Sequence, residues 1–261
     1  MKIITIQNGK GGIGKTTTAW ALATGLPRKY PEYKALAIDF EPSGNLTYLM
    51  DGDFINSPTM YHVFNGDVDI RAAIQHTSQG HVIAGNSSLT KIDKLFSGAD
   101  YLKGISAMKR ELEKLAGEYT HIFIDNVPLV GSIQTLQSTT SAHDLVIPMH
   151  ADALTLQGLA NLREGLLDIR QLNPNLNIAG ILLVKHHQTV NERKYSDVIR
   201  EWAGEMGTKV FNTHIREAID LQTVQGNREN LYAATPDANP TMDYLAFIDE
   251  YLGKGYYYGQ S

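Results

Sequence analysis

The sequence has no cysteine, no long apolar run and no excess of positive charge. The absence of cysteine excludes disulfides, thiolate metal sites, iron–sulfur clusters and a cysteine nucleophile. Apolar runs such as residues 181–184 are far shorter than the roughly 20 residues that span a bilayer. Residues 1–6 lack the long apolar segment of a signal peptide. We therefore expect a soluble, cytoplasmic protein from which no leader is removed.

Acidic residues outnumber basic ones, with 28 Asp and Glu against 23 Lys and Arg, so the formal net charge is −5. Such a chain is not attracted as a whole to nucleic acid or to anionic lipid. Binding to either of them requires a local basic patch.

The chain has 261 residues, 43% of them hydrophobic, and we expect a single domain over residues 1–261. Short β-branched runs alternate with longer helical stretches, which predicts an α/β fold with a mostly parallel sheet and helices on both faces. The predicted strands are residues 2–7, 35–39, 121–125, 145–149 and 178–184. The predicted helices are residues 15–26, 101–118, 154–171, 192–205, 218–225 and 241–252. Residues 51–97 are less regular, and we expect an elaboration on the sheet without chemistry of its own.

A phosphate-binding motif follows the first predicted strand and opens the first predicted helix. The residues that fit GxxxxGK[ST] are Gly9-Lys10-Gly11-Gly12-Ile13-Gly14-Lys15-Thr16. Glycines let successive backbone N–H groups face one centre, where the helix N-terminus adds partial positive charge. Lys15 is predicted to neutralise the β- and γ-phosphates of ATP, and the Thr16 hydroxyl to ligate Mg²⁺. The predicted nucleotide-binding residues are Gly11, Gly12, Ile13, Gly14, Lys15, Thr16 and Thr17.

Lys10 is a second lysine within this loop, directly after Gly9. The loop thereby resembles the "signature lysine" form of the ParA/MinD superfamily of P-loop NTPases, and ParA in particular. The resemblance extends over roughly residues 2–252. It implies that Lys10 reaches across a nucleotide-sandwich dimer to the phosphates of the partner subunit. Two ammonium groups, Lys15 in cis and Lys10 in trans, can offset transition-state charge that one cannot.

Residues 36–47 resemble the LxxDxDPQGNxT segment of the same family. The resemblance implies that Asp39 supports the Mg²⁺ shell and that position 41 orients the attacking water, so both are predicted catalytic residues beside Lys10 and Lys15. Position 41 is Glu here, whereas the family usually has Asp. The carboxylate tip therefore moves by about one carbon–carbon bond, and we expect slow hydrolysis. Ser43 also replaces the usual Gln.

Residues 121–131 resemble the family segment hhhhDxPPxxG, although Val127 replaces its first proline. The resemblance implies that Asp125 holds Mg²⁺ through a water molecule and senses the γ-phosphate. Residues 213–217 resemble a later TxIR segment close to the adenine ring. Arg216 is accordingly the predicted base-contacting residue, and an ordinary surface ion pair is the alternative.

The resemblance implies a partition switch, in which ATP closes a homodimer that binds DNA without sequence preference and so associates with the nucleoid. A ParB-type centromere-binding adaptor would stimulate hydrolysis and release the dimer. The candidate DNA contacts are basic residues that could meet phosphates in a salt-dependent way, or form an ordinary solvated helix face: Lys185, Arg193, Lys194 and Arg200. Because the P-loop stands at the start of the sequence, we expect no helix-turn-helix domain and no operator-specific binding.

Two other functions share this P-loop. A membrane-cycling positioning ATPase of the MinD kind needs a basic amphipathic C-terminal helix, whereas residues 241–252 are acidic, so we expect no stable membrane association. A bacterial tyrosine kinase ends in a tyrosine cluster, as at residues 256–258, but usually carries DxDxR in its second motif. This chain has Asp39-Phe40-Glu41-Pro42-Ser43 there.

Overall fold

The protein is described by a computed structural model that covers residues 1–128, 131–187 and 189–254. Within these residues one sheet of eight strands has the order β3-β4-β2-β5-β1-β6-β7-β8. Every neighbouring pair is parallel except β3 and β4, which are antiparallel. The strands are β1 Lys2–Ile6, β2 Ala35–Phe40, β3 Ile74–Thr77, β4 Gly80–Ile83, β5 His121–Asn126, β6 Asp144–Met149, β7 Asn177–His186 and β8 Ile215–Arg216.

Helices connect the strands and cover the sheet. Those of the described chain are α1 Lys15–Lys29, α2 Asn45–Leu49, α3 Met60–Asn65, α4 Ile92–Leu95, α5 Tyr101–Ile105, α6 Ala107–Glu113, α7 Ile133–Ser141, α8 Ala153–Leu172, α9 Val190–Glu205, α10 Ile219–Asn227, α11 Leu231–Ala234 and α12 Asn239–Leu252. Short 3₁₀ turns are Ile70–Ala73, Ser87–Lys91 and Gly98–Asp100. No helix of the described chain combines the length and the apolar character needed to cross a membrane.

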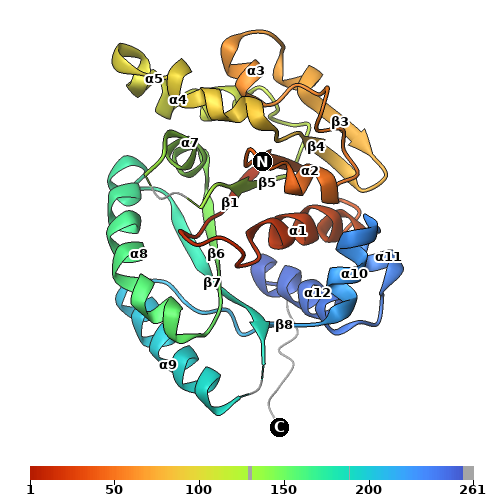
Figure 1. Ribbon diagram of the computed structural model, residues 1–261, viewed down its shortest axis with the longest axis vertical. Coiled ribbons are helices and arrows are strands. Elements are labelled where there is room, and N and C mark those ends of the chain that lie inside the picture. The colour runs from red at the N-terminus through yellow and green to blue at the C-terminus, as the bar shows by residue number, and fades with distance from the viewer. Residues whose placement is uncertain (129–130, 188, 255–261) are drawn as a thin grey trace.

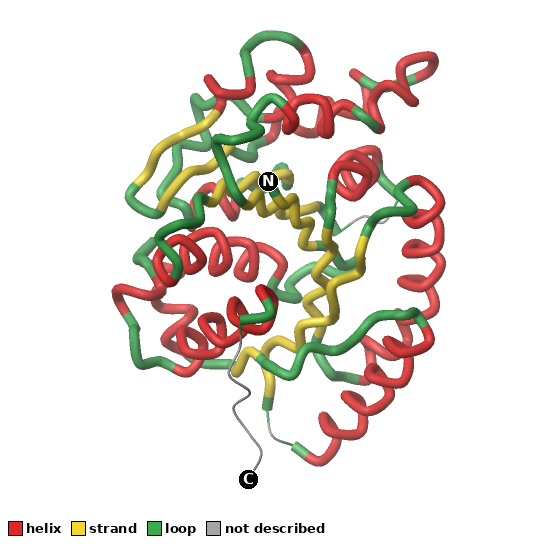
Figure 2. Tube along the Cα trace, turned by 180° about the vertical axis from the view of Figure 1, so that it is seen from behind, coloured by secondary structure: helices red, strands yellow, loops and turns green. Residues whose placement is uncertain are grey.

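The sheet separates two hydrophobic cores. One core lies under α1 and α12, with α10 and α11 beside them, and the other under α7, α8 and α9 (Figure 1). Seen from behind, the strands run between these two groups of helices (Figure 2). Side chains alternate along each strand, so that Ile3 enters the α7 side and Ile4 the α1 side. The predicted α/β class with helices on both faces is confirmed.

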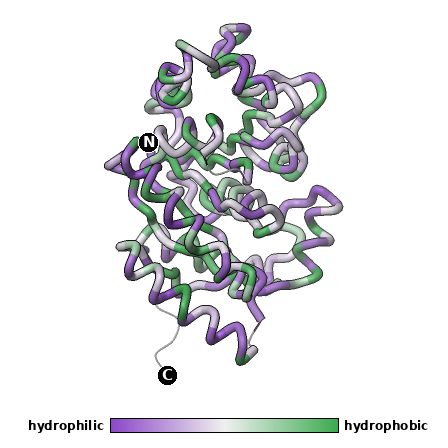
Figure 3. The backbone as a smooth tube through the Cα atoms, turned by 60° about the vertical axis from the view of Figure 1, so that its left-hand side comes forward, coloured by the Kyte–Doolittle hydropathy of each residue, from purple (hydrophilic) through white to green (hydrophobic). Residues whose placement is uncertain are grey.

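Hydrophobic and hydrophilic positions alternate along the outer helices (Figure 3). This alternation is expected of helices that pack on a sheet by one face. In α12, for example, Tyr244, Phe247 and Ile248 are buried, whereas Met242 is exposed. The spacing of the buried residues places them on one side of the helix, toward α1.

The five predicted strands are all present, with ends shifted by no more than two residues. The predicted helix over residues 101–118 is wrong, because it divides into α5 and α6 at Ser106. The break follows Gly104, which packs so closely on Phe96 that a Cβ there would lie 2.6 Å from the ring. Residues 51–97 were expected to elaborate the sheet, and they contribute its strands β3 and β4.

Candidate nucleotide-binding site

Three neighbouring strands end at the same place. In the order β2-β5-β1, Asp39 stands level with Asp125, and Asp125 with Ile6, the last residue of β1. Parallel strands place their carboxyl ends on one edge, which is where ligands bind in open α/β sheets. The fold thus brings together the three segments that the sequence singled out.

The loop between β1 and α1 has the backbone of a phosphate cradle. Gly12 and Gly14 have φ angles of 70° and 80°, in the left-handed region that favours glycine, and Gly14 caps the N-terminus of α1. A Cβ on Gly11 or Gly12 would meet no atom within 4 Å, so this side of the loop faces open space. The Ile13 side chain, in contrast, is buried in the protein. The N-terminus of α1 therefore faces a space that an anion can enter.

Lys15 lies inside the cradle and is only 5% exposed. Its Nζ donates a hydrogen bond to the Lys10 carbonyl oxygen at 2.9 Å. Burial lowers the pKa of Lys15, and the charges of Asp125 and Glu41 oppose that shift. A buried ammonium group is thus placed among two carboxylates at the point where the motif predicts phosphate.

Asp39 is fully buried and holds the segment that follows β2. Its Oδ2 accepts hydrogen bonds from the backbone N–H and the hydroxyl of Thr47, both at 2.7 Å, and its Oδ1 accepts one from the Glu41 N–H at 3.3 Å. Burial raises the pKa of Asp39 to about 6, although these hydrogen bonds favour the ionised form. These contacts link Asp39 to the backbone of Glu41 and Thr47, and its predicted support of the metal shell stays a prediction.

Asp125 is fully buried, and neither of its carboxylate oxygens has a hydrogen-bond partner. Burial and the neighbouring charge of Asp39 raise the pKa of Asp125 well above its usual range, while the Thr16 hydroxyl and Lys15 act in the opposite direction. An unpaired buried carboxylate beside a hydroxyl is the donor set expected for a hard cation such as Mg²⁺. The residues present therefore fit the predicted metal.

Glu41 projects from the segment after β2 and is half-buried. Burial raises its pKa, and the Lys15 ammonium group opposes that shift. Glu41 lines the same pocket as Lys15 and Thr16. Its carboxylate therefore reaches the space where the motif predicts an attacking water.

The pocket has a volume of about 330 Å³, in the range of small-ligand sites. The P-loop and Glu41 line one side. The other side comes from the end of β7, from β8 and from α10 with the residue before it, through Lys185, Ile215, Arg216, Ala218, Leu221, Gln222 and Gln225.

Sequence reasoning missed the α10 wall. Ala218, Leu221, Gln222 and Gln225 follow the i, i+3, i+4, i+7 spacing of one helix face, which is the signal that could have revealed it. Gln225 also donates a hydrogen bond to the Thr17 hydroxyl at 2.8 Å.

Arg216 lines this pocket, as predicted for a base contact, and also forms an ion pair. Its Nη2 lies 2.6 Å from Asp243 Oδ1, and its Nε donates to Asp243 Oδ2 at 2.9 Å. The guanidinium group is held at the pocket by this pair. Base contact by Arg216 stays a prediction.

Lys10 is not among the residues that line the pocket. Its side chain runs along α8, where its Cε lies 3.4 Å from the position that a Cβ on Gly158 would take. Lys15 lines the pocket of its own chain, whereas Lys10 lies outside that lining, against Gly158 of α8.

The four candidate DNA contacts lie on two elements, Lys185 in β7 and the other three in α9, and their role in DNA binding stays a prediction. Arg193 and Lys194 are exposed on α9, and Arg200 is exposed further along it, with Nη2 at 3.3 Å from His214 Nε2. Lys185 lines the nucleotide pocket, and its φ angle of 53° turns the backbone away from the line of β7. The geometry groups Lys185 with the nucleotide site and leaves the other three as a basic stretch on α9.

Known proteins share both the motif and the architecture. The family profile described as an AAA domain matches residues 1–178. The chromosome partitioning protein ParA of Myxococcus xanthus is 30% identical over 84% of this chain and 77% of its own. The chain belongs to the ParA/Soj family. The sporulation initiation inhibitor protein Soj of Bacillus subtilis is 27% identical over 97% of this chain and 99% of its own.

Solved structures share the fold of this chain. Cobyrinic acid a,c-diamide synthase from Mycobacterium smegmatis, with bound ADP and magnesium, has a TM-score of 0.79 and 26% identity and covers 95% of this chain and 92% of its own. A variant of McdA from Cyanothece, in complex with ATP, has a TM-score of 0.83 at 20% identity and covers 100% and 99%. The second likeness shows the fold alone. The resemblance to ParA and the P-loop NTPase fold are both confirmed.

The ParA segment that residues 36–47 resemble would have aspartate at position 41, whereas this chain has the longer carboxylate Glu41. The backbone that carries Glu41 is nevertheless held by Asp39 and Thr47. The departure therefore changes the reach of the side chain and leaves its support in place.

Proposed function

We propose that this ParA/Soj protein is an ATP-dependent dimerising switch that partitions a plasmid or a chromosome. ATP with Mg²⁺ binds the cradle between β1 and α1, and two chains close face to face around two nucleotides. The closed dimer binds DNA without sequence preference. A ParB-type adaptor stimulates slow hydrolysis and opens the dimer.

The placement of the two lysines carries this proposal. Lys15 is buried in the site of its own chain, whereas Lys10 lies along α8 outside the pocket lining. A lysine that lies outside the pocket lining of its own chain is available to the phosphates of a second chain. Because one such lysine from each chain would contact the nucleotide of the other, nucleotide binding would favour the closed dimer.

The residues of the chain divide the work of hydrolysis. Lys15 binds the β- and γ-phosphates and offsets their negative charge. Lys10 of the second chain contributes a second positive charge when the dimer closes. Thr16 and Asp125 would hold Mg²⁺, which offsets charge on the phosphate oxygens when bound. Glu41 orients the attacking water, and Asp39 positions Glu41 through its hydrogen bond to the Glu41 N–H.

The membrane-cycling alternative requires a free amphipathic helix. Among the described residues, α12 buries its apolar side, with Tyr244, Phe247 and Ile248 in the core shared with α1. That helix would have to leave the core before its apolar side could meet lipid. We therefore favour DNA as the surface on which this protein cycles.

DNA binding is expected to depend on ATP and on salt, because phosphates supply the contacts. Replacing Arg193 and Lys194 together by Glu should weaken DNA binding and lower the slope of log affinity against log salt by about two, with basal ATPase unchanged. Fluorescence anisotropy on two unrelated DNA duplexes over a salt series measures both quantities.

The matched control is the replacement of Lys109 and Arg110 by Glu, because these form an exposed basic pair on α6, away from α9. The control should bind DNA as the parent does. An equal loss in both variants would show that α9 is not the contact surface. A strong preference for one duplex, or equal binding without nucleotide, would contradict the switch itself.

A further inference from the structure

Two helix ends near the nucleotide pocket have an unusual backbone. Among the described residues only Asp51, Lys185 and Arg228 combine a positive φ angle with a side chain. Asp51 follows the end of α2 at φ 58°, and Arg228 caps α10 at φ 57°. Glycine is the residue usually found at this position of a helix end. A residue with a side chain at such a position, where glycine is favoured, points to a functional or positioning role for that side chain.

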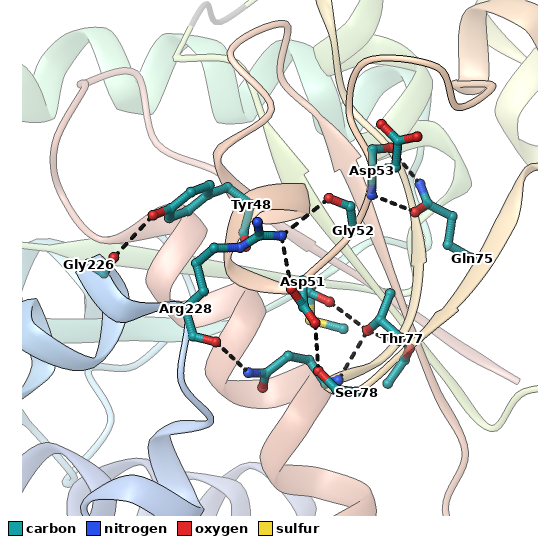
Figure 4. A network of polar contacts seen from close by, with 12 residues as sticks. Tyr48, Asp51, Gly52, Asp53, Gln75, Thr77, Ser78, Gly226 and Arg228 are labelled. Atoms are coloured by element: carbon teal, nitrogen blue, oxygen red, sulfur yellow. Dashed lines mark hydrogen bonds and ion pairs between the residues drawn. The ribbon is translucent and has the colours of Figure 1, made fainter.

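Asp51 and Arg228 contact each other, although 177 positions separate them in the sequence (Figure 4). The Arg228 guanidinium group lies 3.0 Å from Asp51 Oδ1 and 4.8 Å above the centre of the Tyr48 ring. Its Nε donates to the Tyr48 carbonyl oxygen at 3.1 Å, and its Nη2 to that of Gly52 at 3.4 Å. The Tyr48 hydroxyl in turn donates to the Gly226 carbonyl oxygen at 3.1 Å. We call this set, Tyr48, Asp51, Gly52, Gly226 and Arg228, the α2–α10 clasp.

On one side, the clasp contacts α2, the helix that follows the segment carrying Asp39 and Glu41. Thr47, next to Tyr48 in α2, donates two hydrogen bonds to Asp39, and Asp39 accepts from the Glu41 N–H. Asn45, at the start of α2, lines the nucleotide pocket together with Glu41. A displacement of α2 therefore displaces the backbone that supports Glu41.

On the other side, the clasp contacts α10, which forms the wall of the pocket opposite the P-loop. Leu221, Gln222 and Gln225 of α10 line the pocket opposite the P-loop, and Gln225 donates to the Thr17 hydroxyl. Arg228 is the residue at which α10 ends. The clasp thus joins the two walls between which a nucleotide would bind.

We propose that Arg228 is a positioning residue for hydrolysis, which fixes the α10 wall to α2 and thereby sets the place of the Glu41 carboxylate relative to bound ATP. The proposal rests on the proposed ATPase function. Arg228 is not among the residues that line the nucleotide pocket. It acts through Tyr48, Thr47 and Asp39, so its loss should affect kcat more than nucleotide affinity.

The backbone at Arg228 allows a sharp test. Arg228→Gly removes the whole clasp side chain while giving the helix end the residue that its left-handed conformation favours. We expect the variant to keep its thermal midpoint within about 3 °C and its ATP affinity within about threefold, while kcat falls by about tenfold because a small displacement of a catalytic group is costly. Calorimetric ATP binding, thermal unfolding and phosphate release at saturating ATP measure the three quantities.

Asp51→Gly removes the opposite end of the clasp at a position with the same backbone preference, and supplies the test if Arg228→Gly does not fold. The double variant should be no slower than the slower single variant, because both act through one contact. Arg71→Gly is the control, since Arg71 is a half-exposed arginine whose ion pairs with Asp69 and Glu118 lie outside this contact.

An unchanged kcat in a folded Arg228→Gly or Asp51→Gly variant overturns the proposal. So does a loss of kcat that appears only with an equal loss of ATP affinity or with unfolding. A parent protein that does not bind ATP in the same calorimeter would instead refute the proposed function, so the two failures are distinguishable.

Discussion

Replacing Lys15 by alanine is expected to abolish ATP binding. Its ammonium group is buried in the cradle, and no other lysine side chain lines the P-loop side of the pocket. Without it, the P-loop side of the pocket offers the triphosphate backbone N–H groups and hydroxyls but no cation, and the Glu41 carboxylate lines the same pocket. The expected loss is at least about 100-fold, or about 3 kcal/mol, as for the removal of one partner of a buried charged pair.

Two further variants separate charge from folding in this result. Lys15→Gln keeps a donor for the Lys10 carbonyl oxygen, which Lys15 Nζ contacts at 2.9 Å, but it has no charge. It should lose ATP binding almost as fully as Lys15→Ala. Lys10→Ala should bind ATP nearly as the parent does. Calorimetry with a circular dichroism check of folding makes the comparison, and affinity of Lys15→Ala within a few-fold of the parent would remove the P-loop assignment.

Replacing Glu41 by Gln or Ala should hold the protein in its ATP state. The cradle residues, Thr16 and Asp125 remain in these variants, so ATP binding persists. Only the carboxylate that orients the water is lost, and positioned acid–base groups contribute about 100-fold or more to a rate. Single-turnover hydrolysis should slow by about that factor, and DNA binding should outlast that of the parent after ATP is added.

Glu41→Asp is the more discriminating substitution, because it restores the usual residue of the ParA/Soj family. The backbone N–H at position 41 donates to Asp39, which Thr47 holds in place, so we expect the Cα of the shorter residue to keep its position. Turnover should be preserved or should rise. Parent rates in both Glu41→Ala and Glu41→Asp would mean that position 41 has no catalytic role, and Asp39 would become the preferred water-positioning carboxylate.

The part of the site that could be predicted from the sequence is local in the chain. The P-loop needs glycines and a lysine at fixed spacing, and Asp39 and Asp125 end buried strands, so each signal lies within a dozen residues. Parallel strands then bring these segments to one edge without further information.

The remaining features depend on contacts between distant segments. Strands β3 and β4 are short and lack a clear apolar alternation, and β4 joins the sheet only by pairing with β2. The helix predicted over residues 101–118 divides into α5 and α6 at Ser106, next to the close contact of Gly104 with Phe96. Arg228 contacts Tyr48 and Asp51, which lie far from it in the sequence, so no local sequence pattern predicts the contact.

The central claim is that nucleotide state controls dimer closure, and sedimentation velocity tests it most directly. The parent protein with Mg²⁺ and a non-hydrolysable ATP analogue should sediment as a dimer, and with ADP as a monomer. Lys10→Ala should remain a monomer with the analogue while still binding it, because the lysine that lies along α8 is the one proposed to reach the second chain. The same sedimentation coefficient for the parent in both nucleotides would contradict the account.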